Sequence, residues 1–252
     1  MKRNIVAMGG GRIMLPEPKK VETLSIDKAI VRMSTVKQPR VLFIPTASED
    51  NEEYCEAIQR LYADHLKCHI DFLLLYRDRP DAKTIRSLIR KADIIYVGGG
   101  NTLRMMRYWK QLGVIALLDQ ARKRGTILCG LSAGAICWFR QGNSDSRKFK
   151  DGKNKTLIKV SGLDYVDLLL CPHYDTEKHR QPSLKKMMRT TRGIAVALEN
   201  CVAIQIKDDA YRILASKKNR FAWLIYSRKG KDYKIKLEPS SAYKKLDSLY
   251  PE

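Results

Sequence analysis

The chain of 252 residues contains no apolar run close to the roughly 20 residues that a membrane-spanning helix needs. Its first apolar stretch, residues 5–8, is too short for the apolar core of a secretory signal. The six cysteines include no Cys-x-x-Cys pair and lie mostly within apolar stretches, which is typical of reduced, buried thiols. We therefore expect a cytoplasmic protein without a membrane segment, a disulfide framework or a metal site.

Acidic residues are scarce, with 27 Asp and Glu against 48 Lys and Arg, so the formal net charge is +21. The basic residues lie in several separate segments, and no zinc finger or basic motif interleaved with aromatic residues accompanies them. This pattern favours a solvated basic surface that would attract small acidic substrates. Binding of a polyanion such as nucleic acid stays open as the alternative.

Short apolar strands and amphipathic helices alternate along the first half of the chain. Strands are expected at residues 5–8, 39–45, 70–76 and 92–97, and helices at about 25–33, 52–65 and 81–91. This alternation predicts an α/β fold with a mostly parallel, doubly wound sheet and helices on both faces. After Gly193, short apolar runs divided by polar turns predict antiparallel strands near the C-terminus.

We find no internal repeat or linker, so residues 1–252 are expected to form a single domain with a polar, lysine-rich tail at about 229–252. Residues 141–146 are predicted to form a polar loop.

A Gly-x-Ser-x-Gly sequence at residues 130–134 follows an apolar run and precedes a pattern compatible with a helix. A strand, a sharp turn and a helix would expose Ser132 at the end of the sheet, as in enzymes with a nucleophilic serine. The amide of Ala133 would then lie at a helix N-terminus, where it could stabilise an oxyanion. A closely packed turn without catalytic function is the alternative, because short motifs also occur by chance.

Three glycines, Gly98 to Gly100, end the expected fourth strand, and Asn101 and Thr102 follow at a helix start. Functional groups in parallel sheets lie beyond the carboxyl ends of the strands, where this loop and Ser132 would both be found. The spacing matches neither a phosphate-binding loop nor a dinucleotide-binding loop. The loop therefore predicts a second oxyanion donor from Gly99 or Gly100, with side-chain donors and acceptors from Asn101 and Thr102.

The chain has only four histidines, and His173 lies at the end of an apolar run. That position, downstream of the serine turn, suits a general base. His65 and His69 flank a helix-to-strand junction and His179 lies in a charged stretch, so these three are weaker candidates. A structural role is the alternative for His173 as well.

Together, the motifs at residues 97–102, 130–135 and 171–175 resemble those of the peptidase E and cyanophycinase-like serine peptidases, whose fold is related to that of class I glutamine amidotransferases. The resemblance runs from about residue 5 to residue 226. It implies Ser132 as the nucleophile and His173 as the base, with an oxyanion hole from the glycine loop and Ala133.

The resemblance implies Asp145 as the acid that orients the histidine, and Glu199 is a second candidate for that role. Asn101, Thr102 and Arg140 are expected near the substrate. Many relatives carry an acid where this chain has Arg140, so a changed substrate preference is expected there.

We therefore expect a serine dipeptidase that cleaves short peptides without a cofactor, and the resemblance implies a preference for an N-terminal aspartate. A homodimer stays open. An esterase of the α/β-hydrolase type is disfavoured, because the histidine follows the serine too closely for the order Ser, acid, His. The alternative from another class is a family member without activity that binds an acidic ligand or nucleic acid.

Overall fold

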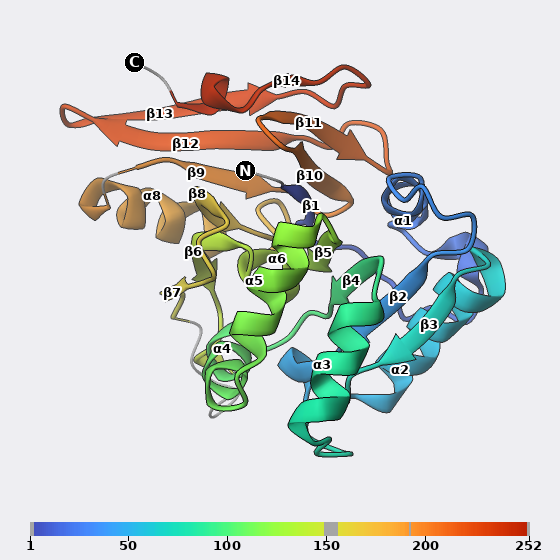
Figure 1. Ribbon diagram of the computed structural model, residues 1–252. Helices are drawn as coiled ribbons and strands as arrows, with labels where there is room; N and C mark the ends of the chain where they lie inside the picture. Colours follow the sequence, from blue (N-terminus) through green and yellow to red (C-terminus); the bar gives the residue numbers. More distant parts are fainter. Residues whose placement is uncertain (1–2, 149–155, 192, 251–252) are drawn as a thin grey trace.

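A computed structural model describes residues 3–148, 156–191 and 193–250, which form two β-sheets with helices packed around them (Figure 1). The first sheet has eight strands in the order β14-β11-β10-β1-β5-β4-β2-β3. Its parallel strands are β1 (Asn4–Met8), β2 (Arg40–Ile44), β3 (His69–Phe72), β4 (Ile94–Val97) and β5 (Ile127–Leu131). Its antiparallel strands are β10 (Val202–Lys207), β11 (Ala210–Ala215) and β14 (Lys244–Lys245).

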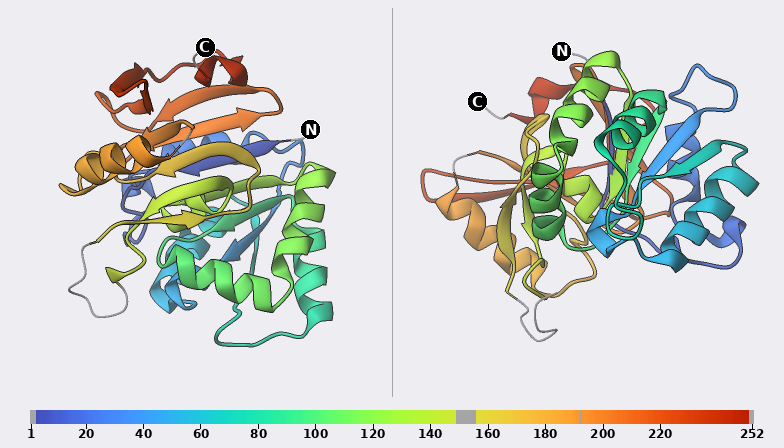
Figure 2. Two further views of the ribbon diagram at one scale, coloured as in Figure 1. Left: turned by 90° about the vertical axis from the view of Figure 1, so that its left-hand side faces the viewer. Right: turned by 60° about the horizontal axis from the view of Figure 1, so that its bottom comes forward.

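Helices cover both faces of the parallel strands because successive strand residues point to opposite sides. Val41 and Phe43 pack in one apolar cluster with residues of α1 (Leu24–Val31), α2 (Glu52–Ile58) and its π-helical continuation η3 (Gln59–His65). Leu42 and Ile44 pack on the other face with residues of α3 (Ala82–Lys91), α4 (Thr102–Gln111) and α5 (Val114–Arg124). The doubly wound α/β fold and its antiparallel C-terminal strands are thus confirmed (Figure 2).

The second sheet has six strands in the order β13-β12-β9-β8-β6-β7. Its strands are β6 (Phe139–Ser144), β7 (Ile158–Ser161), β8 (Val166–Cys171), β9 (Ala195–Leu198), β12 (Ala222–Arg228) and β13 (Lys231–Leu237). α8 (Arg180–Thr190) packs against this sheet through Leu184 and Met188. The predicted loop at residues 141–146 is wrong for its first four residues, which belong to β6.

One apolar cluster contains residues from both sheets, among them Leu42 and Leu128 of the first and Leu170 and Val196 of the second. Four further elements within the described ranges are single turns: η1 (Pro18–Lys20), η2 (Thr46–Ser48), α6 (Ala133–Ile136) and η4 (Leu246–Leu249). None of the helices in the described ranges is long and apolar enough to cross a membrane.

The two sheets meet where the loops after β1, β8 and β9 touch. The backbone N–H of His173, two residues beyond β8, donates to the carbonyl of Gly9, with N and O 3.0 Å apart. The N–H of Cys201, beyond β9, donates to the carbonyl of Gly10 over 2.9 Å. These two bonds bring segments of the second sheet to the end of β1, which lies beside β5 and its serine.

Candidate active site

Ser132 occupies a strained turn between β5 and α6. Its backbone has φ 56° and ψ −111°, a conformation that a residue with a side chain rarely adopts. The turn is tightly packed, because a Cβ on Gly130 or Gly134 would come closer than 3.0 Å to backbone atoms of neighbouring segments. The two glycines of the motif are therefore required for α6 to approach β4 and β5, as expected of a nucleophile elbow.

His173 reaches the serine from the second sheet. The His173 Nε2 and Ser132 Oγ atoms are 2.8 Å apart, which is hydrogen-bond distance. Burial of the imidazole, followed by the nearby guanidinium of Arg180, lowers the pKa of His173 below its usual value. The imidazole is therefore neutral near pH 7 and can accept the proton of the serine hydroxyl.

The other ring nitrogen of His173 contacts an amide and not a carboxylate. Nδ1 lies 2.8 Å from Oδ1 of Asn200, the second residue after β9. Asn200 was not among the candidates from the sequence, although Glu199 beside it was. No local sequence signal marks Asn200, because its place at the end of a strand parallel to the strand before His173 follows from the pairing of β8 and β9.

The prediction that Asp145 orients His173 is wrong, because the Asp145 carboxylate faces Arg180 and Asn200 occupies the place beside His173 Nδ1. Asp145 directly follows β6, and its carboxylate lies 3.6 Å from Arg180 Nη2. Arg180 is buried and also pairs with Glu177 over 2.6 Å, so Asp145 belongs to the surroundings of this arginine. Glu199 turns away too, because its carboxylate accepts from the Trp223 indole over 2.8 Å.

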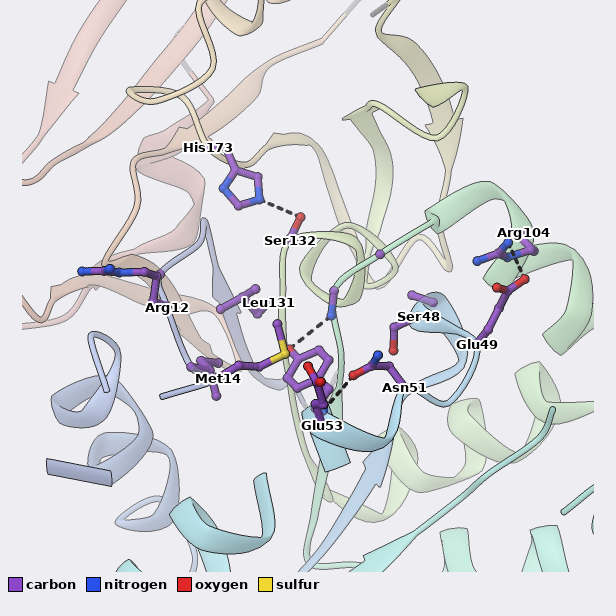
Figure 3. Close-up of a pocket in the computed structure, with 16 residues that line it drawn as sticks. Arg12, Met14, Ser48, Glu49, Asn51, Glu53, Arg104, Leu131, Ser132 and His173 are labelled. Carbon is purple, nitrogen blue, oxygen red and sulfur yellow. Dashed lines mark hydrogen bonds and ion pairs between the residues drawn. The ribbon is translucent and has the colours of Figure 1, made fainter. Parts of the chain in front are cut away.

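A cavity of about 690 Å³ opens beside Ser132 and His173 (Figure 3). Leu131 and Tyr54 are among the residues that line it, and the exposed side chain of Met14 contributes a further apolar surface. The charged residues that line it are Arg12, Glu49, Glu53 and Arg104, of which Glu49 and Arg104 form an ion pair of 2.5 Å. The cavity therefore offers charges of both signs near a serine–histidine pair.

Gly99 and Gly100 also line this cavity. The N–H of Gly99 donates to the Tyr54 hydroxyl, with N and O 3.3 Å apart. Gly100 has φ +137°, and a Cβ there would come closer than 3.0 Å to Ala47. Because the Gly99 amide is already engaged, Gly100 is the better placed of the two for a ligand.

The three residues expected near the substrate are not among the described residues that line the cavity. Asn101 caps α4, where its Oδ1 accepts from the N–H of Arg104 over 3.0 Å. The Thr102 side chain is buried 3.3 Å from the Ser144 hydroxyl. Arg140 lies on β6 in an ion pair of 2.5 Å with Asp167. A direct role of these side chains in binding a substrate is not supported by their positions.

Comparison with known proteins places the chain among peptidases. The model of peptidase family S51 matches residues 5–214. The uncharacterized peptidase YgaJ of Bacillus subtilis (strain 168) is 38% identical over 188 residues, covering 74% of this chain and 75% of that protein. Peptidase E of Salmonella gallinarum (strain 287/91 / NCTC 13346) is 29% identical over 116 residues, which are 44% of this chain and 47% of that protein.

The fold has a counterpart among solved structures. The crystal structure of a peptidase from an acI-B1 Actinobacterium superposes with a TM-score of 0.72 and covers 97% of each chain, at 17% sequence identity. Fold and relatives together define a peptidase. The chain belongs to peptidase family S51, since the family model covers most of its length.

Proposed function

We propose that this peptidase is a serine peptidase that hydrolyses short peptides with Ser132 as its nucleophile and His173 as its base. The observation that carries the proposal is the 2.8 Å contact between Ser132 Oγ and His173 Nε2, on a strained turn that faces a cavity. A nucleophile, a base within hydrogen-bond reach and a group that orients the base are the minimum for acyl transfer.

In the proposed mechanism, Ser132 Oγ attacks the peptide carbonyl carbon while its proton passes to His173 Nε2. The carbonyl oxygen becomes an oxyanion, held by the amides of Ala133 and Gly100. The Ala133 amide is suited to this because the first N–H groups of a helix have no acceptor within the helix. His173 then returns the proton to the leaving amine as the C–N bond breaks, and water hydrolyses the acyl-enzyme by the same steps.

The cavity supports a short peptide with an acidic residue as the substrate, including the proposed N-terminal aspartate. Arg12 pairs with Glu22 over 3.4 Å, but 77% of its side chain is accessible, so its guanidinium can also bind a substrate carboxylate in the cavity. Glu53, an exposed acid on the same cavity, offers the opposite charge for the ammonium group of a peptide N-terminus. No cofactor takes part in these steps.

Hydrolysis of a panel of dipeptides and aminoacyl arylamides, acidic and neutral, tests the proposal. We expect Ser132→Ala to lose on the order of 10⁴- to 10⁶-fold in kcat. The matched control is Ser248→Ala, an exposed serine that bonds only the Lys245 carbonyl within the described residues. Equal rates for Ser132→Ala and the wild type would contradict the assignment. If the wild type cleaves nothing in the panel, salt-dependent binding of acidic ligands becomes the function to test.

A further inference from the structure

The structure holds His173 and Asn200 against the backbone of Gly10. A Cβ at Gly10 would come closer than 3.0 Å to both Asn200 Oδ1 and His173 Nδ1. A glycine at this point therefore leaves just the space that the pair of side chains fills. This explains the function of the middle glycine in the run from Gly9 to Gly11.

The backbone of Asn200 is fixed from two sides. Its own N–H donates to Asp175 Oδ1 over 2.8 Å, and Asp175 is in turn ion-paired with Arg220. The next residue, Cys201, donates to the Gly10 carbonyl over 2.9 Å. These contacts do not involve the imidazole, and they fix the backbone from which the side-chain amide of Asn200 faces His173.

The orientation of this amide determines which nitrogen of His173 carries the proton. In the structure Asn200 Oδ1 faces His173 Nδ1, and Nδ2 lies 3.4 Å from Thr176 Oγ1, to which it can donate. An amide oxygen only accepts hydrogen bonds, and therefore His173 Nδ1 must be the donor. Nε2 is then left with a lone pair for the Ser132 hydroxyl.

We propose that Asn200 is the positioning residue of a Ser132–His173–Asn200 triad, and that its uncharged amide keeps the histidine a neutral base to lower pH than a carboxylate there would. This proposal rests on the function proposed above. A carboxylate at hydrogen-bond distance stabilises the imidazolium by direct charge attraction, whereas an amide oxygen offers only its dipole.

The other charges around the pair do not replace such a carboxylate at Nδ1. They are the cations Arg12, Arg180 and Arg220 and the carboxylates Asp145, Asp175 and Glu177. Asp175 is neutralised by Arg220, and Glu177 and Asp145 flank the buried Arg180. Burial and Arg180 together lower the pKa of His173, in the direction opposite to that of a charged triad member.

The test compares Asn200→Asp and Asn200→Ala with the wild type by kcat and KM as functions of pH. Asn200→Asp should move the acidic limb of the kcat/KM profile upward by about 1 to 3 pH units. Asn200→Ala should lower kcat by about 10²-fold or more with KM nearly unchanged, because the base loses its orientation. Asn219→Asp, which adds the same charge at an exposed turn, is the control and should leave the profile in place. Unchanged profiles for Asn200→Asp, or a full kcat for Asn200→Ala, would overturn the proposal.

A second measurement does not depend on any substrate. ¹⁵N NMR of the His173 ring should show Nδ1 protonated and Nε2 unprotonated in the wild type, with a higher ring pKa in Asn200→Asp. Gly10→Ala should disturb this tautomer, whereas Gly230→Ala should not. A Cβ at Gly230 meets nothing within 4 Å, and the strain of a side chain at its φ of +75° falls on the turn between β12 and β13. The Nε2–H tautomer in the wild type would overturn the triad even if peptides are cleaved. The expected tautomer without any peptide cleavage would contradict the proposed function and leave the positioning of His173 intact.

Discussion

At the scale of single residues, Tyr54 links the α2 helix to the glycine loop beside the serine. Its hydroxyl accepts the N–H of Gly99, and burial raises its pKa well above the usual value, so the hydroxyl keeps its proton. Tyr54 also packs edge-on against Phe43, with ring centroids 5.1 Å apart. The glycine loop is therefore fixed by a hydrogen bond that it donates to the hydroxyl of a tyrosine whose ring is held in the core.

We predict that Tyr54→Phe lowers kcat about tenfold with little change in KM, since a displaced oxyanion donor affects the transition state more than the bound substrate. The half-buried N–H of Gly99 would lose its acceptor, which costs about 1 kcal/mol and allows the loop to shift. Steady-state kinetics on the best peptide of the panel measure this. Tyr233→Phe, at an exposed position on β13, is the control. A kcat equal to that of the wild type would show that the Tyr54 hydroxyl does not position the loop.

Ser132, His173 and the glycine loop could be predicted because each follows an apolar run in a recognisable motif. Asn200 could not, because it lies 27 residues from His173 and asparagine is an ordinary residue for a turn. The sequence pointed to Asp145 through the family resemblance, but a buried arginine, Arg180, holds that side of the site. Which polar residue meets a histidine depends on how strands pair, and strand pairing between distant segments is not visible in a local pattern.

At the scale of elements, most strands and helices of the first sheet lie close to their predicted positions because their apolar residues recur regularly, although β3 ends at Phe72, four residues before its predicted end. β6 is different, since five of its six residues are polar or glycine, at positions 140–144. The hydrogen-bonding groups of the buried Asn143 find their partners on α8. The Asn143 backbone carbonyl accepts from Arg180, and the Asn143 side-chain amide donates to the Ser183 hydroxyl over 3.0 Å. The sequence of β6 therefore looks like that of a polar loop, because the residues that form hydrogen bonds with Asn143 lie about 40 positions away in the chain.

The contact between α1 and η3 contains a buried acid, Asp27, that makes stability depend on pH. Its carboxylate accepts from Thr23 over 2.7 Å and from the Tyr62 hydroxyl over 2.8 Å, and burial raises its pKa to about 6. Its usual value is 3.8, so the folded state binds the proton more tightly than the unfolded chain between those pH values. The contribution to stability is therefore greatest below about pH 4 and is lost as the pH rises to about 6.

We predict that Asp27→Asn removes this dependence. Between pH 4 and pH 7 the free energy of unfolding of the wild type should fall relative to that of Asp27→Asn by about 3 kcal/mol, from a shift of about two pKa units. Urea unfolding of both proteins at four pH values measures the difference, in which other titrating groups cancel. Asp64→Asn, an exposed acid on η3, is the control and should run parallel to the wild type. A constant difference between Asp27→Asn and the wild type would mean that Asp27 does not titrate in this range.

At the scale of the whole molecule, the site lies where two sheets meet, in a chain with a formal net charge of +21. Ser132 comes from the first sheet, and His173 and Asn200 come from the second, so the site depends on how the sheets are joined. The alternation of elements predicted the parallel sheet but not its division into two. The net charge of +21 was known from composition, and β13 carries part of it on Lys234 and Lys236, which lie over the rings of Trp223 and Phe221.

We predict that this charge accelerates the capture of acidic peptides. A positive field raises the encounter rate of anions, and salt screens it, because the Debye length shrinks from about 10 Å at 0.1 M to about 3 Å at 1 M. Raising sodium chloride from 0.05 to 0.5 M, concentrations chosen on the order of these screening limits, should lower kcat/KM for an acidic peptide about three- to tenfold. The same salt range should change kcat/KM for a neutral peptide of equal length by less than about twofold. The neutral peptide controls for salt effects on the enzyme itself. Equal salt dependence of kcat/KM for the two peptides would mean that the positive charge does not serve substrate capture. Binding of the acidic peptide by Ser132→Ala separates capture from chemistry: if its affinity shows the same salt dependence, the effect lies in capture and not in the chemical step.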